Sequence, residues 1–408
     1  MFLCADLDAF FVSVEQALDP TLIAKPVIVG GLPKERGVVA SASYEARKFG
    51  IHSGMPTAHA HRLCPHAIFL KGNFEHYRWF SRKFYKILSS FSPDINMSSI
   101  DEAYVNIKGT KRLFGPQLAL AKRLKSEIKT ELNIPVSIGI ARTKIFSKIA
   151  CDRSKPDGLL VIQPDEEMEF LSPLAVSVLP GIGPKHVAIL KNLNINTIAE
   201  LLKTPDWALG VALGNYAKVL KFFINGGDFN SCDRIKSISR ETTLTEDTLD
   251  KNLVYALFYY LTERACATLR GKKLLANLVT VKIRFSDFKT VSKRAKIPPS
   301  NAQQVIFEYG TRVLQDILQE RKRVRLTGIA LSKFQYDGLQ PSMFEIKQRR
   351  LNQLNFALDR VRDKFGFSSL YPANTSIMHK CQDPNSPAER DPRFSYTTKN
   401  NMINRDKF

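Results

Sequence analysis

Short apolar runs alternate along the chain with longer segments that have the apolar spacing of helices. The run at residues 2–5 reads as a buried strand that leads directly into Asp6 and Asp8, and residues 9–19 then show helical spacing. The same two patterns recur, with helical spacing at 73–91 and 117–132 and strand composition at 95–107 and 136–141. This order predicts an antiparallel sheet with helices on one face, an α+β layer arrangement.

The pattern changes twice in the second half of the chain. Between about residues 166 and 227, short helical segments joined by glycine and proline predict a small all-helical domain. Residues 237–335 then follow the order β-α-β-β-α-β, which is typical of a split βαβ unit. An amphipathic helix follows at 351–370, and the polar, Pro- and Asn-rich composition from Tyr371 to residue 408 predicts a disordered tail.

Charge narrows the class of partner. Lys and Arg number 60 against 39 Asp and Glu in 408 residues, a formal net charge of +21, which favours a polyanionic partner such as nucleic acid. Residues 234–335 carry 20 basic and 9 acidic residues, so about half of the excess lies in about a quarter of the chain.

Two further features bear on the compartment. No apolar run reaches the length of a membrane span and the first residues lack the pattern of a signal peptide, so we expect a cytoplasmic protein with no membrane partner. The six cysteines are scattered without a Cys-x-x-Cys pair, which indicates neither a zinc site nor a disulfide framework.

Three carboxylates occupy strand positions where a packed domain usually carries few charges. Asp6 ends the first strand, and Asp101 and Glu102 are adjacent near the start of another. Acids that converge repel one another unless a divalent cation neutralises them, and ligands that are all oxygen favour magnesium. Two such cations about 3.5–4 Å apart form the apparatus of phosphoryl transfer. Taken alone, however, this acid pair is better explained as exposed strand-edge acids that pair with lysines.

Five motifs together resemble the Y-family translesion DNA polymerases, in their DinB or DNA polymerase IV branch. They are DLDAFFVSVEQ, VASASYEARKFGIHSGM, SSIDEAY, SIGIARTKIFSKIACDRSKPDG and LPGIGPK, and the resemblance runs from residue 1 to about 370. Agreement of several long motifs in type and order is far more specific than any one of them. The resemblance implies an α+β multidomain right hand, with a palm at 1–10 and 73–165, fingers at 11–72, a helical thumb with a helix-hairpin-helix at 166–230, and a β-α-β-β-α-β little-finger domain at 236–336.

The resemblance also implies roles for individual residues. Asp6, Asp101 and Glu102 take the places of the catalytic carboxylates that bind two magnesium ions, with the backbone carbonyl of Leu7 on the nucleotide-side ion. Asp8 has no ligand role in the pattern and is interpreted either as a structural residue or as one that supports the metal ligands. Phe11 takes the place of the steric gate that excludes a 2′-hydroxyl, while Phe10 is left to the core. The positions that bind the triphosphate are Ser41, Tyr44, Arg47 and Lys155.

Further residues are predicted to hold DNA or a partner protein. LPGIGPK resembles the hairpin of a helix-hairpin-helix, in which Gly181, Gly183 and Lys185 approach a phosphate without reading bases. The basic strands of the little-finger domain suit salt-dependent phosphate contacts through Lys282, Arg284, Lys293 and Arg294. Gln340, Met343 and Phe344, in the segment 337–370, resemble the peptide by which bacterial polymerases dock on the sliding clamp, although Pro341 and Met343 depart from the commoner leucines. An ordinary loop is the alternative.

These features predict a monomeric, template-directed translesion polymerase that adds dNTPs to the 3′ end of primer-template DNA, at low fidelity and without proofreading. The small residues Val38, Ala40 and Gly54 are expected to leave an open roof over the nascent base pair. One alternative is a catalytically inactive, clamp-bound adaptor, against which the retained acids argue. Another is a structural DNA-binding protein, which would have no use for Tyr44 and Arg47 together with those acids.

Overall fold

The first strand, β1 (Phe2–Leu7), lies in the middle of a five-stranded sheet and is almost wholly buried. It runs antiparallel to both neighbours, with Asp6 opposite Glu102 on one side and Ser137 on the other. The strand order is β5 (Ile95–Met97), β6 (Glu102–Asn106), β1, β7 (Val136–Ala141) and β8 (Leu159–Val161). The predicted antiparallel pairing is confirmed for β5, β6, β1 and β7. The sequence pattern did not indicate β8, which runs parallel to β7 because α7 crosses over between them.

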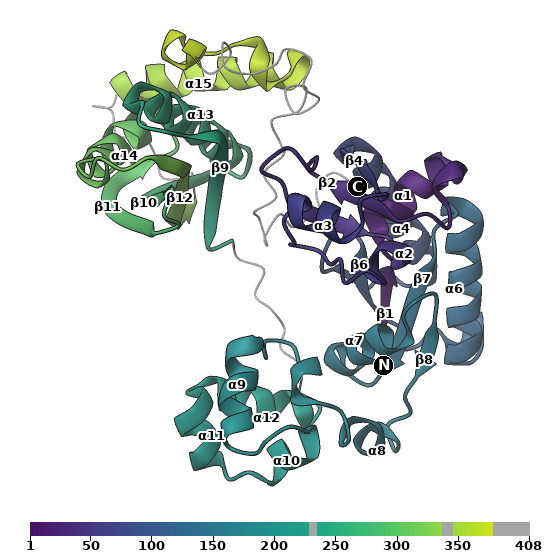
Figure 1. Ribbon diagram of the computed structural model, residues 1–408. Coiled ribbons are helices and arrows are strands. Elements are labelled where there is room, and N and C mark those ends of the chain that lie inside the picture. The colour runs from purple at the N-terminus through teal and green to yellow at the C-terminus, as the bar shows by residue number, and fades with distance from the viewer. Residues whose placement is uncertain (228–234, 337–345, 378–408) are drawn as a thin grey trace. The chain divides into compact units, whose positions relative to one another are not determined.

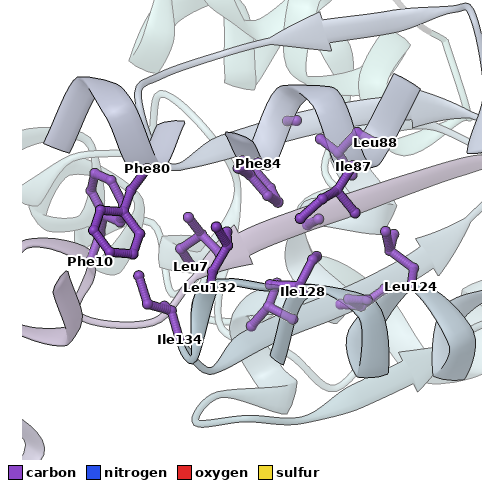
Figure 2. Packing of buried hydrophobic residues seen from close by; sticks show 14 of the residues in the cluster. Leu7, Phe10, Phe80, Phe84, Ile87, Leu88, Leu124, Ile128, Leu132 and Ile134 are labelled. Carbon is purple, nitrogen blue, oxygen red and sulfur yellow. The ribbon is translucent and has the colours of Figure 1, made fainter. Parts of the chain in front are cut away.

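Alternation along β1 divides its side chains between the two faces of the sheet. Leu3, Ala5 and Leu7 face α4 (Phe74–Phe91) and α6 (Gln117–Leu132). Figure 2 shows this core, in which Phe80, Phe84, Ile87 and Leu88 of α4 face Leu124, Ile128 and Leu132 of α6, with Leu7 between the two helices. The helical apolar spacing of both segments is what fills this layer.

The opposite face of β1 carries Cys4 and Asp6 and packs against α7 (Lys144–Ser154). The contact is close because β7 presents a glycine there: a Cβ on Gly139 would lie 2.1 Å from the Ser147 carbonyl oxygen and 2.2 Å from the Cys151 nitrogen. The prediction of helices on one face only is therefore wrong, since the sheet lies between α4 and α6 on one side and α7 on the other.

A second, smaller sheet follows α1 (Phe10–Leu18) in the chain. Its strand order is β3 (Val39–Ala42), β2 (Val27–Gly30) and β4 (Ile68–Leu70), with β2 and β4 parallel. The short helices α2 (Tyr44–Arg47) and α3 (Thr57–Leu63) complete this part, and α5 (Lys111–Phe114) precedes α6. Ser43 begins α2 with a side-chain cap, because its hydroxyl accepts from the Ala46 N–H.

The all-helical segment predicted after residue 166 is present. It comprises α8 (Glu167–Leu171), α9 (Pro184–Asn192), α10 (Ile198–Lys203), α11 (Asp206–Leu213) and α12 (Tyr216–Ile224). Buried Leu190, Leu201 and Leu220 form one core with Phe146 and Ile149 of α7. The same helix that covers the large sheet therefore also contributes to the core of this segment.

The computed structural model describes residues 1–227, 235–336 and 346–377 (Figure 1). The chain divides into two compact units at residues 231/232. In the second unit the predicted β-α-β-β-α-β order is confirmed, with a fully antiparallel sheet in the order β11, β10, β12, β9. The elements are β9 (Ser237–Thr248), α13 (Lys251–Gly271), β10 (Leu274–Phe285), β11 (Thr290–Ser300), α14 (Gln303–Ile317) and β12 (Val324–Tyr336).

The C-terminal helix α15 (Ile346–Phe365) packs on this second unit through charged groups. Arg362 and Glu263, both buried, form an ion pair of 2.9 Å, and the guanidinium of Arg270 holds both carboxylate oxygens of Asp359. Gly366, with φ 92°, follows the helix as predicted. The prediction of a disordered tail from Tyr371 is wrong for residues 371–377, because they include the turn Ala373–Thr375, in which Thr375 is buried. Residues 378–408 lie outside the described residues.

Replacing Gly139 with alanine should destabilise the first unit, because the added Cβ meets the backbone of α7 and one partner must shift. We expect a loss of about 1–3 kcal/mol in the free energy of unfolding, measured by urea denaturation. The matched control is Gly210→Ala within α11, where an added Cβ meets nothing within 4 Å and alanine should stabilise the helix by up to about 1 kcal/mol. Equal effects of the two changes would contradict the close approach of α7 to β7.

Candidate active site

Asp6 and Glu102 are brought together by the register of β1 and β6. They are directly opposite one another on neighbouring strands, and Asp6 is 7% exposed. Side chains of such pairs lie on the same face of a sheet, so the two carboxylates share the face covered by α7. Two partly buried carboxylates this close repel one another unless a cation lies between them.

That cation is the ammonium group of Lys148, a residue of α7. Its Nζ lies 2.7 Å from Asp6 Oδ2 and 2.7 Å from Glu102 Oε2. Burial opposes the charge of the ammonium, but the carboxylates of Asp6 and Glu102 outweigh burial and raise the pKa of Lys148 well above its ordinary value. Lys148 is therefore a charged bridge between the two strands.

Asp101 lies beside this pair but is held by a different contact. Its Oδ1 accepts from the Ser99 hydroxyl, whose oxygen in turn accepts from the backbone N–H groups of Asp101 and Glu102. Burial, together with the nearby charges of Asp6 and Glu102, raises the pKa of the Asp101 carboxyl. The negative charge of Asp101 is thus unfavourable beside the carboxylates of Asp6 and Glu102.

The donor set fits a divalent cation. Among the residues that the structure describes, no group of three or more His, Cys, Asp or Glu side chains is arranged as a metal site. Nevertheless, Asp6 and Glu102 already bind one cation between them in the form of the Lys148 ammonium. Their oxygens, with Asp101 adjacent, are the hard ligands that magnesium prefers.

Asp8 has the contacts of a structural residue. Its carboxylate is buried and accepts hydrogen bonds from the Ser137 hydroxyl at 2.8 Å and the Asp157 N–H at 2.7 Å. Burial raises the pKa of Asp8, and these two hydrogen bonds oppose that effect. Asp8 therefore ties the end of β1 to β7 and to the turn that follows α7.

The predicted triphosphate-binding residues lie around this end of the sheet. Lys155, at the C-cap of α7, places its Nζ 2.8 Å from Asp6 Oδ2. Tyr44 donates to Asp8 at 3.4 Å, and burial together with that carboxylate raises the pKa of Tyr44 to about 12. The Arg47 guanidinium lies over the Tyr44 ring at 4.7 Å, while Ser41 is buried in β3. Contacts through Asp8 and Asp6 thus link Tyr44, Arg47 and Lys155 to the acids.

Phe11 and Phe10, the first two residues of α1, have separate environments. Phe10 is buried in the core, as expected. Phe11 is partly buried and stacks on Tyr77, with ring centroids 4.4 Å apart and an interplanar angle of 25°. The Tyr77 hydroxyl in turn donates to Glu15 Oε1 at 2.5 Å. The ring of Phe11 is therefore held in one orientation by a buried, hydrogen-bonded aromatic partner.

The predicted hairpin has the backbone that it needs. Gly181 has φ 86°, and Gly183 is the N-cap of α9, whose first turn carries exposed Lys185. A Cβ on Gly181 would lie 2.0 Å from the Tyr216 hydroxyl oxygen, and that hydroxyl donates to the Pro180 carbonyl. Tyr216 thus fixes the hairpin from α12.

The four basic residues proposed for DNA contact are not equivalent. Register places Lys282, Arg284 and Arg294 on the sheet face away from α13 and α14, and Lys293, opposite buried Val281, on the other. Lys282 forms a 2.6 Å ion pair with Glu241, whereas Arg294 and Lys293 are exposed on the edge strand β11. Gln340, Met343 and Phe344 lie outside the described residues.

Sequence reasoning missed the residues that act through tertiary contact, namely Lys148, Asp152, Glu15, Tyr77 and Tyr216. Lys148 and Asp152 are four positions apart in the motif TKIFSKIACDRS and therefore share one face of the helix. This spacing was the signal that could have indicated an ion pair between them. Nothing in the sequence joins Lys148 to Asp6, which lies 142 positions earlier.

Comparison with known proteins agrees with this geometry. Residues 5–152 match the impB/mucB/samB family and residues 235–343 match the C-terminal domain of that family. A protein of Dehalococcoides mccartyi (strain ATCC BAA-2266 / KCTC 15142 / 195) called DNA polymerase IV is 44% identical over 375 residues, which cover 91% of this chain and 96% of the relative. One from Desulfatibacillum aliphaticivorans with the same name is 35% identical over 376 residues, which cover 90% of this chain and 95% of the relative. The chain belongs to the Y-family DNA polymerases, in their DNA polymerase IV branch.

Solved structures of other Y-family polymerases share the fold. The Y-family DNA polymerase chimera Dbh-Dpo4(243-245)-Dbh has a TM-score of 0.72 and is 30% identical, over 81% of this chain and 98% of that one. An insertion ternary complex of Dbh DNA polymerase has a TM-score of 0.58 and 29% identity, over 81% of this chain and 98% of that one. The predicted right-hand fold with a little-finger domain is confirmed, and this Y-family polymerase is a translesion DNA-directed DNA polymerase. The adaptor alternative finds no support. No described helix of this polymerase is long and apolar enough to cross a membrane.

Proposed function

We propose that this polymerase adds dNTPs to the 3′ end of primer-template DNA at the acids that β1 and β6 bring together, and that Asp6, Asp101 and Glu102 hold two magnesium ions there. The convergence of these acids on one end of the sheet carries the proposal. Bound divalent cations would activate the attacking 3′-hydroxyl and stabilise the pyrophosphate leaving group. The Leu7 carbonyl is assigned to the nucleotide side, and Glu102 to the primer side.

The cations near the acids suit the triphosphate. Lys155 and Tyr44 contact acids at the end of β1, and Arg47 lies over the Tyr44 ring. Ser41 lies in β3, the strand that precedes α2 in the chain. Arginine offers several donors in a rigid fork, and a lysine adds a compact charge, so these residues would bind and orient the phosphates. Because Asp8 and Ser137 fix the strand ends, the phosphate-binding residues and the acids would stay aligned.

Selection of the sugar is assigned to Phe11. Its ring is fixed by the stack on Tyr77, so a ribose 2′-hydroxyl directed at it would meet a group that cannot move aside. Nucleic acid would be held by Gly181, Gly183 and Lys185 of the hairpin, by the exposed basic residues of β11 and by the half-buried ones of β10. Among these, the pairing with Glu241 makes Lys282 the weakest candidate.

Two further assignments concern partners and compartment. Gln340, Met343 and Phe344 are assigned to a sliding clamp on their likeness to clamp-binding peptides. A cytoplasmic location is supported by Cys4, Cys64, Cys151 and Cys266, which are buried as free thiols, as is usual in a reducing compartment.

Primer extension tests the metal-binding acids. The wild type should extend a primer past an abasic template position with magnesium and dNTPs, and Asp101→Asn should lower that rate about 100-fold or more through loss of a metal ligand. Without metal, the variant should be at least as stable thermally as the wild type at neutral pH. Because the pKa of Asp101 is raised in the folded protein, the free energy of unfolding falls as pH rises past the ordinary range of an aspartate and the carboxyl ionises. Asparagine carries no such charge. Wild-type extension rates from a folded Asp101→Asn protein would refute the assignment.

Ribonucleotide incorporation tests Phe11. Phe11→Ala should raise the ratio of rNTP to dNTP incorporation about 100-fold, because removal of the ring opens space for the 2′-hydroxyl. Phe74→Ala is the matched control, because Phe74 is also half-buried and its ring centroid lies 5.9 Å from that of Phe11. Phe74 has no assigned contact with the sugar. If both variants change the ratio alike, or neither does, Phe11 is not the gate.

Clamp-dependent synthesis tests the segment at 340–344. Replacing Met343 and Phe344 with alanine should abolish the stimulation of synthesis by a bacterial sliding clamp, because those side chains are proposed to fill its apolar pocket. Extension without the clamp is the control and should stay unchanged. Stimulation that persists in the variant would show that these residues form an ordinary loop.

A further inference from the structure

Lys148 occupies the place between Asp6 and Glu102 that a divalent cation bound by these carboxylates would need. Its ammonium is 2.7 Å from an oxygen of each, and its side chain is 20% exposed. An ammonium and a divalent cation that contact the same two oxygens, Asp6 Oδ2 and Glu102 Oε2, cannot occupy one position, because their volumes would overlap and their charges repel. One of the two must move when the other is present.

The carboxylates are less free to move than the lysine. Asp6 and Glu102 lie on paired strands in the middle of a sheet, and β1 is packed on both faces. Lys148 projects from a helix on a flexible four-carbon stem, so rotation about its side-chain bonds can relocate the charge without moving the backbone.

A second partner for Lys148 is already within reach. Asp152 lies one turn further along α7, with Oδ1 at 3.0 Å from Lys148 Nζ and 3.3 Å from Lys155 Nζ. Its side chain is 49% exposed, so it can follow the ammonium outward while keeping the ion pair. Residues four apart on a helix pair readily.

The number of charged groups around the site also allows a divalent cation to be added. Four carboxylates, those of Asp6, Asp101, Glu102 and Asp152, face two ammonium groups, those of Lys148 and Lys155. The difference is two negative charges, which equals the charge of one divalent cation. The cluster can therefore accept the first of the two proposed ions while Lys148 stays nearby, and the negative charges of a bound triphosphate would accompany the second.

We propose that Lys148 is an exchangeable internal cation: it bridges Asp6 and Glu102 in the metal-free protein and withdraws to Asp152 when a divalent cation binds. This inference rests on the proposed metal-binding role of these acids. It makes Lys148 a positioning residue that holds the two strands' carboxylates together between metal-binding events. It also makes Asp152 a residue that tunes metal affinity without itself binding the metal.

The test measures Mn²⁺ binding to the full chain, without DNA or nucleotide, by electron paramagnetic resonance at fixed ionic strength. Lys148→Met removes the competing cation and should raise Mn²⁺ affinity about threefold or more, while Asp152→Asn removes the alternative partner and should lower it about twofold or more. Lys144→Met is the matched control. It removes the same charge from the same helix, where the Lys144 ammonium lies 5.5 Å from the centre of the Phe2 ring, and should leave the affinity unchanged.

The double variant separates exchange from plain electrostatics. In a Lys148→Met background the Asp152→Asn change should alter Mn²⁺ affinity clearly less than it does in the wild type, because no Lys148 ammonium remains to pair with Asp152. Independent charge effects would instead add. Strict additivity, or unchanged affinity in Lys148→Met, would overturn the proposal.

Thermal stability gives a second readout. Without metal, Lys148→Met should unfold at a lower temperature than the wild type, because two partly buried carboxylates lose their shared cation, and saturating Mn²⁺ should reduce the difference. If that variant does not fold, the wild type still decides: the lysine Nζ signal of Lys148 in nitrogen NMR should change on titration with Mg²⁺, and an unchanged signal would refute the exchange.

Asp6→Asn distinguishes failure of this inference from failure of the site assignment. If Asp6→Asn leaves Mn²⁺ binding intact, the acids are not the metal ligands and both proposals fall. If Asp6→Asn abolishes binding while the Lys148 and Asp152 variants behave as the wild type, only the exchange is wrong.

Discussion

Repulsion among carboxylates at one end of a buried sheet is the constraint on which the rest of the site depends. The pairing of β1 with β6 sets Asp6 opposite Glu102, and Asp101 precedes Glu102 in the chain. Removing charged groups from water is costly unless they are paired, so the fold must supply cations at this point. It supplies them from one helix, since Lys148 and Lys155 both belong to the α7 segment.

The close packing of α7 follows from that need. A lysine can reach the strand ends only if its helix lies near the sheet, and Gly139 permits this because it has no Cβ to meet the α7 backbone. The same helix adds Phe146 and Ile149 to the core of the following helical segment. One helix therefore joins three parts of the first unit: the sheet, the charged site and the helical segment.

Two polar networks, one buried and one partly buried, keep the surroundings of the acids in place. Asp8 joins β1, β7 and the turn after α7 through hydrogen bonds with Ser137 and Asp157. Tyr77 of α4, hydrogen-bonded to Glu15 of α1, supports the ring of Phe11. Because buried polar groups are costly when unpaired, both networks resist displacement, and the groups that contact substrate would be held by neighbours that do not.

The sequence by itself determined the types of the longer elements, the β-α-β-β-α-β order of the second unit and the acids themselves, because these depend on local periodicity and on residues adjacent in the chain. Motifs such as SSIDEAY and LPGIGPK also sufficed for the family, since their order is a property of the chain. Only the tertiary structure decided that α7 lies on the face opposite α4 and α6, and that β8 is parallel to β7. It alone placed Lys148 between Asp6 and Glu102 and packed the turn Ala373–Thr375 against α13. The reason is physical: which face a helix covers and which charges meet are set by strand register and side-chain packing between residues far apart in the chain, and no local pattern encodes them.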